Sequence, residues 1–174
     1  MVLHHLKEAN KHFDLKDTRR MKIIKAGNQD KAEVLKLLDE FRTECLRIIS
    51  PLDPTVFSAA SEFGQSVFEQ VINSTASAIY LAISNNVYIG ILTIHKIPRI
   101  RRADYCAEIE EMYVKPAFQG KNVANDLMTT AINWALENNI KTIRLESNIA
   151  LERDHFFYEK MGFTNYGKAY ELTL

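Results

Sequence analysis

The chain has 174 residues, and its 22 lysines and arginines balance 22 aspartates and glutamates. This balance excludes a global field that would draw the protein to nucleic acid or to an anionic membrane. The length corresponds to about one domain, which buries roughly 70% of its unfolded surface and so forms a real core. The two cysteines, Cys45 and Cys106, lie far apart without metal-ligand spacing, which indicates a reducing, cytoplasmic compartment and no metal site.

The N-terminal segment carries many charges and lacks the apolar run of a secretory signal. We expect residues 1–20 to form a flexible arm and residues 21–174 to form one domain. The first strand of that domain is predicted to begin at Met21.

Two helical regions are predicted next. Asp30 with Glu33 resembles a capping box that opens a helix, which ends before the prolines at positions 51 and 54. A second helical region is predicted from Thr55 to Ile72, with an interruption near Gly64.

Residues 70–95 contain no charged side chain, which on length alone could suggest a membrane span. Polar residues precede the apolar part, and the turn residues of Ser84-Asn85-Asn86 interrupt it. The pattern therefore predicts a hairpin with strands at residues 78–84 and 87–97 instead of a membrane-spanning helix.

The next segment is the most informative one. Glu110-Glu111-Met112-Tyr113-Val114 reads as a strand that bears carboxylates, and Pro116 ends it. A loop over residues 119–124 then opens a helix whose apolar positions recur at helical spacing from Val123 to Ala135. Backbone amides at a helix N-terminus carry positive partial charge and bind phosphate oxygens. This order predicts a site for a cofactor that contains a diphosphate.

The last third of the chain continues the alternation of strands and helices. We predict a strand at residues 141–146, a helix at residues 152–161 and a terminal strand at residues 166–174. Strands placed around two helix pairs indicate a mixed α/β domain whose sheet is covered on both faces.

Three motifs together resemble the GNAT superfamily of acetyl-CoA-dependent N-acetyltransferases. They are a strand that ends in V-x-P at Val114, a Q-x-x-(G)-x-A loop from Gln119, and F-Y-E-K-x-G-F from Phe157. The resemblance spans roughly residues 21–174, and one position departs from it, because the family usually has glycine where this chain has Asn122. The spacing from Ser147-Asn148 through His155 to Tyr158 resembles the subgroup that acetylates small amines, aminoalkylphosphonates among them.

The resemblance implies a GNAT fold with a central mixed, largely antiparallel sheet of about seven strands flanked by about four helices. The sheet would splay between its fourth and fifth strands, where the pantetheine arm of the cofactor inserts. The resemblance also implies catalytic roles for Tyr158 as the acid, and for Glu110 or Glu108 as the carboxylate that assists deprotonation. The residues implied to bind acetyl-CoA are Met112, Tyr113, Val114, Gln119, Gly120, Lys121, Asn122, Val123, Ala124, Asn148 and Tyr158.

Ordinary pKa values limit these roles. A glutamate with a pKa near 4.3 and an amine with a pKa near 10.4 differ by about 6 units, or roughly 8 kcal/mol, so direct proton transfer is unfavourable. The proton would instead pass through water while the site desolvates the amine. A phenol near 10 giving a proton to a thiolate near 8.5 is uphill by only about 2 kcal/mol.

Each candidate also has a structural alternative. Strand alternation places Glu108, Glu110, Met112 and Val114 on one face, where Glu110 could pair with a helix lysine. Tyr158 could be a core aromatic, and His155 a satisfied structural histidine. The arginines of the expected hairpin tip, Arg99, Arg101 and Arg102, fit a solvated turn, with attraction of an anionic acceptor as the alternative.

The sequence thus predicts an N-acetyltransferase that transfers the acetyl group of acetyl-CoA to a primary amine of a small molecule, by direct attack in a ternary complex. We expect a monomer or homodimer without nucleic-acid or membrane partners. One alternative is an acetyltransferase of proteins or peptides. The other is a non-catalytic acyl-CoA sensor, which is suggested by Asn122 at a position where the family usually has glycine.

Overall fold

The computed structural model describes residues 21–49 and 58–172. Five strands form one sheet in the order β1-β2-β3-β4-β5: β1 (Met21–Lys25), β2 (Ser77–Ser84), β3 (Val87–Arg99), β4 (Asp104–Val114) and β5 (Ile143–Leu145). The first four pair antiparallel, and β5 pairs parallel with β4. The mixed, largely antiparallel sheet is confirmed, with five strands among the described residues where about seven were expected.

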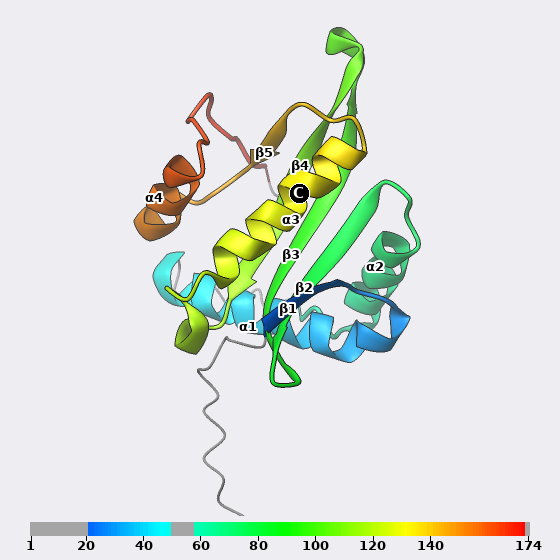
Figure 1. Cartoon of the computed structure of the whole chain (residues 1–174), viewed down its shortest axis with the longest axis vertical. Coiled ribbons are helices and arrows are strands. Elements are labelled where there is room, and N and C mark those ends of the chain that lie inside the picture. Colours follow the sequence, from blue (N-terminus) through cyan, green and yellow to red (C-terminus); the bar gives the residue numbers. More distant parts are fainter. Residues whose placement is uncertain (1–20, 50–57, 173–174) are drawn as a thin grey trace, which may run out of the picture.

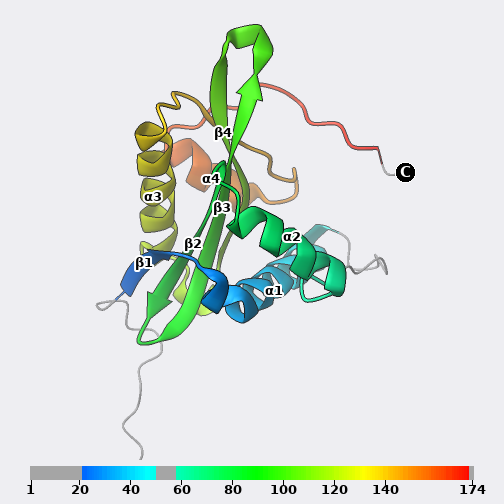
Figure 2. The same ribbon diagram turned by 90° about the vertical axis from the view of Figure 1, so that its right-hand side faces the viewer.

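The described residues form four α-helices around the sheet, and Figures 1 and 2 show their arrangement. They are α1 (Lys31–Ile49), α2 (Glu62–Ile72), α3 (Val123–Glu137) and α4 (Glu152–Lys160). Helix α3 lies across one face of the sheet, whereas α1 and α2 lie against the other face (Figure 2). Helix α4 follows β5 at the edge of the sheet (Figure 1).

Each face of the sheet has its own hydrophobic core. Under α3, Leu92 and Ile94 of β3 pack with Leu127 and Met128 of the helix, all four with no exposed area. Gly90 lets the helix approach, because a Cβ at this position would meet Leu127 Cδ1 at 3.2 Å and the carbonyl oxygen of Tyr113 at 3.0 Å. The core under α1 and α2 contains Val34, Leu37, Phe68, Leu81, Ile91 and Tyr113.

Two expectations about the helices are corrected. Gly64 lies inside α2 instead of interrupting it; its N–H donates to the cap residue Ser61 at 3.1 Å. A Cβ on Gly64 would meet the carbonyl oxygen of Ala59 at 2.2 Å, so close backbone approach explains the glycine. Asp30 makes no box with Glu33: its carboxylate accepts the N–H of Gly27 at 2.9 Å and the hydroxyl of Tyr88 at 2.8 Å.

The expected terminal strand is wrong for the residues described, because residues 166–172 form no strand. Gly167 interrupts the segment, and β5 offers a ladder of only three residues. Tyr166, Tyr170 and Leu172 are consequently exposed. The predicted arm at residues 1–20 and the prolines at positions 51 and 54 lie outside the described residues.

The hairpin of β3 and β4 extends beyond the body of the molecule (Figures 1 and 2). Its tip is a 3₁₀ turn at Ile100–Arg102, and Arg99 binds Asp104 across its base at 2.6 Å. Among the described residues, no helix is long and apolar enough to cross a membrane.

Candidate active site

The sheet opens between β4 and β5. Pairing of the two strands stops at Ile109 with Leu145, but β4 continues to Val114. The N–H of Lys115 donates to the carbonyl of Ile89 in β3 at 2.9 Å. Because backbone groups alternate sides along a strand, the amides of Met112 and Val114 face the open side, whereas that of Tyr113 faces β3.

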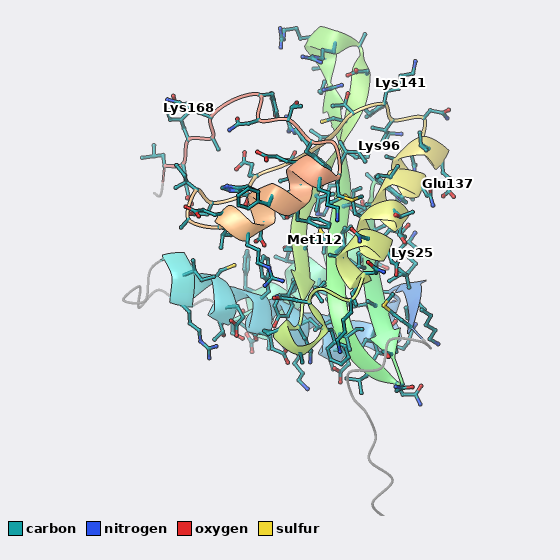
Figure 3. The ribbon with its side chains drawn as sticks, turned by 60° about the vertical axis from the view of Figure 1, so that its left-hand side comes forward. Lys25, Lys96, Met112, Glu137, Lys141 and Lys168 are labelled. Carbon is teal, nitrogen blue, oxygen red and sulfur yellow. The ribbon has the colours of Figure 1, made fainter. Side chains whose placement is uncertain are left out.

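A pocket of about 180 Å³ occupies this opening. Met112 lies on β4 beside α4 (Figure 3) and contributes to its wall. The lining comes from α1, β4, β5 with the loop that follows it, and α4: Phe41, Ile109, Glu110, Met112, Leu145, Glu146, Ser147, Asn148, Leu151, Asp154 and Tyr158. The pocket therefore brings the predicted residues Glu110, Met112, Asn148 and Tyr158 together.

A β-bulge changes which residues of β4 share a face. Leu92 pairs with Met112 but Ile94 pairs with Ile109, so two residues of β4, Glu110 and Glu111, stand opposite Thr93. Ile109 and Met112 both pack in the core under α3. The expectation of one face for Glu108, Glu110, Met112 and Val114 is therefore wrong, because the extra residue reverses the alternation.

Strict alternation would put Glu110 and Glu111 on opposite faces of the sheet. The bulge instead places Glu111 beside Glu110. The carboxylate of Glu111 accepts the hydroxyl of Thr93, and that hydroxyl in turn accepts the N–H of Glu111 at 3.0 Å. Burial, assisted by the charge of Glu110, raises the pKa of Glu111 to about 7. A carboxyl that exchanges its proton near neutral pH thus lies next to the pocket.

The two predicted carboxylates differ in their surroundings. Glu108 lies opposite Arg144 of β5, and its Oε2 accepts both Nη2 at 2.7 Å and Nε at 3.0 Å. The structure therefore places Glu108 in an ion pair outside the pocket lining. Glu110 is exposed and lines the pocket, so it is the carboxylate available to a bound amine.

Tyr158 reaches the pocket from α4. Its ring makes edge contacts with Phe157 and Phe163, at centroid distances of 5.5 Å and 5.9 Å. Burial, followed by the charges of Asp154 and Cys45, raises the pKa of Tyr158 to about 12. The hydroxyl therefore keeps its proton at neutral pH. Tyr158 therefore packs against other aromatic rings and also lines the pocket.

The loop before α3 leaves the amides of that helix open. Gly120 and Asn122 have φ angles of 75° and 66°, so the asparagine adopts the left-handed conformation usually reserved for glycine. No side chain caps the helix, because the Oδ1 of Asn122 accepts the side chain of Asn125 at 3.2 Å. The first-turn amides at Val123 and Ala124 have no acceptor within the helix. This arrangement fits an anionic diphosphate.

Gln119 holds the loop in place. Its Nε2 donates to the carbonyl of Val114 at 2.9 Å, and its Oε1 accepts Nη1 of Arg153 in α4 at 2.6 Å. The side chain thus joins β4, the loop and α4. The Nζ of Lys121 lies 5.6 Å from the centre of the Phe118 ring.

Asn148 organises the turn before α4. Its Oδ1 accepts the N–H of Ala150 at 2.9 Å, and its carbonyl lies 3.0 Å from Nε2 of His155. The histidine contact agrees with the structural alternative for His155. In the described part of the chain, no group of histidine, cysteine or carboxylate side chains could hold a metal ion.

The acetyltransferase (GNAT) family model matches residues 37–163, which is most of the chain. The chain belongs to this family. Two curated members of the acetyltransferase class match parts of it. An N-acetylaspartate synthetase of Danio rerio is 28% identical over 100 residues, covering 58% of this chain and 34% of that protein. An aminoalkylphosphonate N-acetyltransferase of Salmonella typhimurium is 26% identical over 83 residues, covering 48% of this chain and 54% of that protein. The chain thus spans about a third and about half of these relatives.

Solved structures show the same GNAT fold. An aminoglycoside acetyltransferase from an uncultured soil metagenomic sample has a TM-score of 0.75 at 16% identity, covering 91% of this chain and 99% of that one. A ribosomal-protein-alanine N-acetyltransferase of Brucella melitensis biovar Abortus 2308 has a TM-score of 0.67 at 16% identity, covering 88% and 99%. The predicted family and fold class are confirmed.

Sequence reasoning missed three residues of this GNAT site. Glu111 lies beside Glu110 because of the bulge in β4, and no sequence pattern predicted that bulge. Arg153 and Asp154 lie in the helix that carries Tyr158, and only the packing of α4 against the pocket brings them to the site. Asp154 lies four residues before Tyr158 and so shares its helix face, which was the available signal for this residue.

Proposed function

We propose that this protein transfers the acetyl group of acetyl-CoA to a primary amine of a small molecule, by direct attack in a ternary complex. The observation that carries the proposal is the opening between β4 and β5, where one pocket holds both Glu110 and Tyr158. Both matched relatives are named for the acetylation of small amino compounds. We also propose that the protein is cytoplasmic, in agreement with its free cysteines, and acts as a monomer or homodimer.

Acetyl-CoA would supply the thioester. The amides of Val123 and Ala124 and the backbone at Gly120 would hold its diphosphate. Nothing lies within 4 Å of a Cβ placed on Gly120, which leaves room for the diphosphate. The open-side amides of Met112 and Val114 would bind the pantetheine arm and the thioester carbonyl. Gln119 would act by fixing the loop, which also contains Lys121 and Asn122. Asn148 would form the wall of the pocket on the side of β5 and α4.

Two side chains would handle the protons. Glu110 lines the pocket and would accept a proton from the amine through water, with Glu111 behind it as a further acceptor near neutral pH. Tyr158 would donate to the departing thiolate. The desolvation that raises the pKa of Tyr158 also raises that of a thiolate in the same pocket, so their difference stays small enough for transfer.

The decisive experiment measures free-thiol release from acetyl-CoA with polyamines, amino acids, aminoglycosides, aminophosphonates and lysine peptides. We expect release with at least one small amine and little with the peptides. Cofactor binding without release on any amine would favour the sensor, and peptide preference would favour the protein acetyltransferase. Asn122 gives the sensor little support, since it adopts the conformation of the glycine that it replaces.

A further inference from the structure

The pocket walls carry charge of one sign. Glu110 of β4, Glu146 of the segment after β5 and Asp154 of α4 all line the pocket, and each carries a carboxylate side chain. No lysine, arginine or histidine is among the lining residues in the described ranges. Three different elements therefore supply negative charge to one cavity.

Three basic side chains on the described elements around the pocket have partners outside its lining. Arg144 binds Glu108 at 2.7 Å, Arg153 donates to Gln119 at 2.6 Å, and Lys115 binds Glu40 at 3.1 Å. None of the ion pairs within residues 21–49 and 58–172 includes a pocket carboxylate. The negative charge of the cavity is thus left for a bound molecule to balance.

The pKa of Asp154 reflects the placement of a negative charge in a partly buried position. Its carboxyl is partly buried, and desolvation raises its pKa against the smaller opposing effect of Arg153 and His155. A ligand that fills the pocket removes more water from this group. Such a ligand binds well only if it brings a positive group to the carboxylate, and a negative group would add repulsion.

We infer that the acceptor amine carries a second cationic group, so that its class is a short diamine or polyamine. The inference rests on the proposed acetyl transfer and narrows its acceptor. One amine would lie at Glu110 and be acetylated, while the other would lie at Glu146 and Asp154. Amino acids and aminoalkylphosphonates would bring a carboxylate or phosphonate against the same walls.

The test compares three acceptors of equal chain length that differ in the group at the far end: 1,4-diaminobutane, 4-amino-1-butanol and 4-aminobutanoate. Thiol release at saturating acetyl-CoA gives kcat/KM for each. We expect the diamine to exceed the neutral alcohol by about tenfold or more, and the alcohol to exceed the acid, because a charged hydrogen bond contributes at least that factor. Raising the salt concentration should raise the KM of the diamine more than that of the alcohol.

Two neutralising variants assign the preference to its residues. In Asp154→Asn and Glu146→Gln, the ratio of kcat/KM between diamine and alcohol should fall several-fold. Glu159→Gln removes an exposed carboxylate of the same helix that does not line the pocket, and its ratio should match the parent. A ratio that stays unchanged in both pocket variants would overturn the assignment.

The outcomes separate this inference from the proposed function. Turnover of 4-aminobutanoate equal to or faster than that of the diamine would overturn the dicationic acceptor and leave acetyl transfer to an amine standing. Absence of thiol release with all three acceptors and with the wider panel would remove the proposed function, and the inference with it.

Discussion

At the scale of single residues, the surroundings decide which of several similar side chains can act. Three glutamates follow one another closely in β4, but Arg144 holds Glu108, Thr93 holds Glu111, and Glu110 alone lines the pocket. The sequence predicted Glu110 and Tyr158 through the family resemblance. It could not separate Glu108 from Glu110, because the partner of Glu108 comes from a strand 36 residues later.

Tyr158→Phe should keep the packing of α4 and remove only the proton donor. We expect turnover to fall by about 100-fold to 10,000-fold, with little change in melting temperature or in cofactor affinity. Steady-state kinetics and thermal unfolding check both parts. Tyr170→Phe, a variant of an exposed tyrosine in the C-terminal segment, is the control. Full turnover with lowered stability would make Tyr158 a core aromatic instead.

Glu110→Gln and Glu108→Gln should have different effects. The first removes a basic group from the pocket, so its rate should fall most at low pH and recover as the acceptor amine loses its proton. The second breaks the pair with Arg144 and should mainly lower stability, by about 1 to 2 kcal/mol. Rate profiles against pH and chemical unfolding would distinguish them. Identical pH profiles for parent and Glu110→Gln would remove Glu110 from the mechanism.

The raised pKa of Glu111 predicts a dependence of stability on pH. The folded state holds this proton up to about pH 7, whereas an ordinary carboxyl near 4.5 has lost it. The stabilisation that this proton gives is therefore fully present below about pH 4.5, and it is lost as the pH rises through 7, at a cost of about 3 kcal/mol.

Glu111→Gln keeps an acceptor for Thr93 and removes that titration. We expect it to match the parent near pH 4.5 and to exceed it in free energy of unfolding at pH 8, as chemical denaturation at both values can show. Glu159→Gln should follow the parent throughout. A constant difference between parent and Glu111→Gln at both pH values would contradict the raised pKa.

At the scale of elements, the sequence predicted the helices and strands that have strong periodicity or strong turn signals. The hairpin at Ser84–Asn86, helix α3 and helix α4 fall within a residue or two of expectation. The sequence did not predict what depends on neighbours in space: the contact of Gly64 with Ala59, the hydrogen bond from Tyr88 to Asp30, and the unpaired segment after Phe163. A strand forms only where a second strand offers a ladder, which a local pattern cannot report.

The turn before α3 gives a prediction at this scale. Asn122→Gly keeps the left-handed conformation and should leave stability and acetyl-CoA affinity within experimental scatter. Asn122→Val places a β-branched residue there and should cost about 1 to 2 kcal/mol while weakening the cofactor. Asn133→Val, in an exposed position of the same helix, is the control for loss of asparagine. Denaturant unfolding and calorimetric titration measure both effects; an Asn122→Val variant as stable as the parent would contradict the strain.

At the scale of the whole molecule, cofactor binding should hold several elements together. The proposed contacts come from β4, the loop after it, α3 and the wall before α4, and Gln119 with Arg153 already links three of these. Ligand at about 100 times its dissociation constant should add roughly 2.7 kcal/mol to the free energy of unfolding. Thermal unfolding with and without acetyl-CoA checks this, and free adenosine is the control without a diphosphate. An unchanged melting temperature at millimolar acetyl-CoA would contradict the site.

The bulge in β4 makes this pocket depend on the number of residues in the strand as well as on their identity. Deleting residue 111 would restore an unbroken ladder opposite Thr93, and one half of β4 would then turn each side chain to the opposite face. Either Tyr113 would leave its stack on Phe41, or the pairing that sets Glu108 against Arg144 would be lost. Single substitutions in β4 change one side chain each and leave the alternation of the strand intact. A deletion of residue 111 would therefore dismantle the site although every side chain that lines the pocket is still encoded.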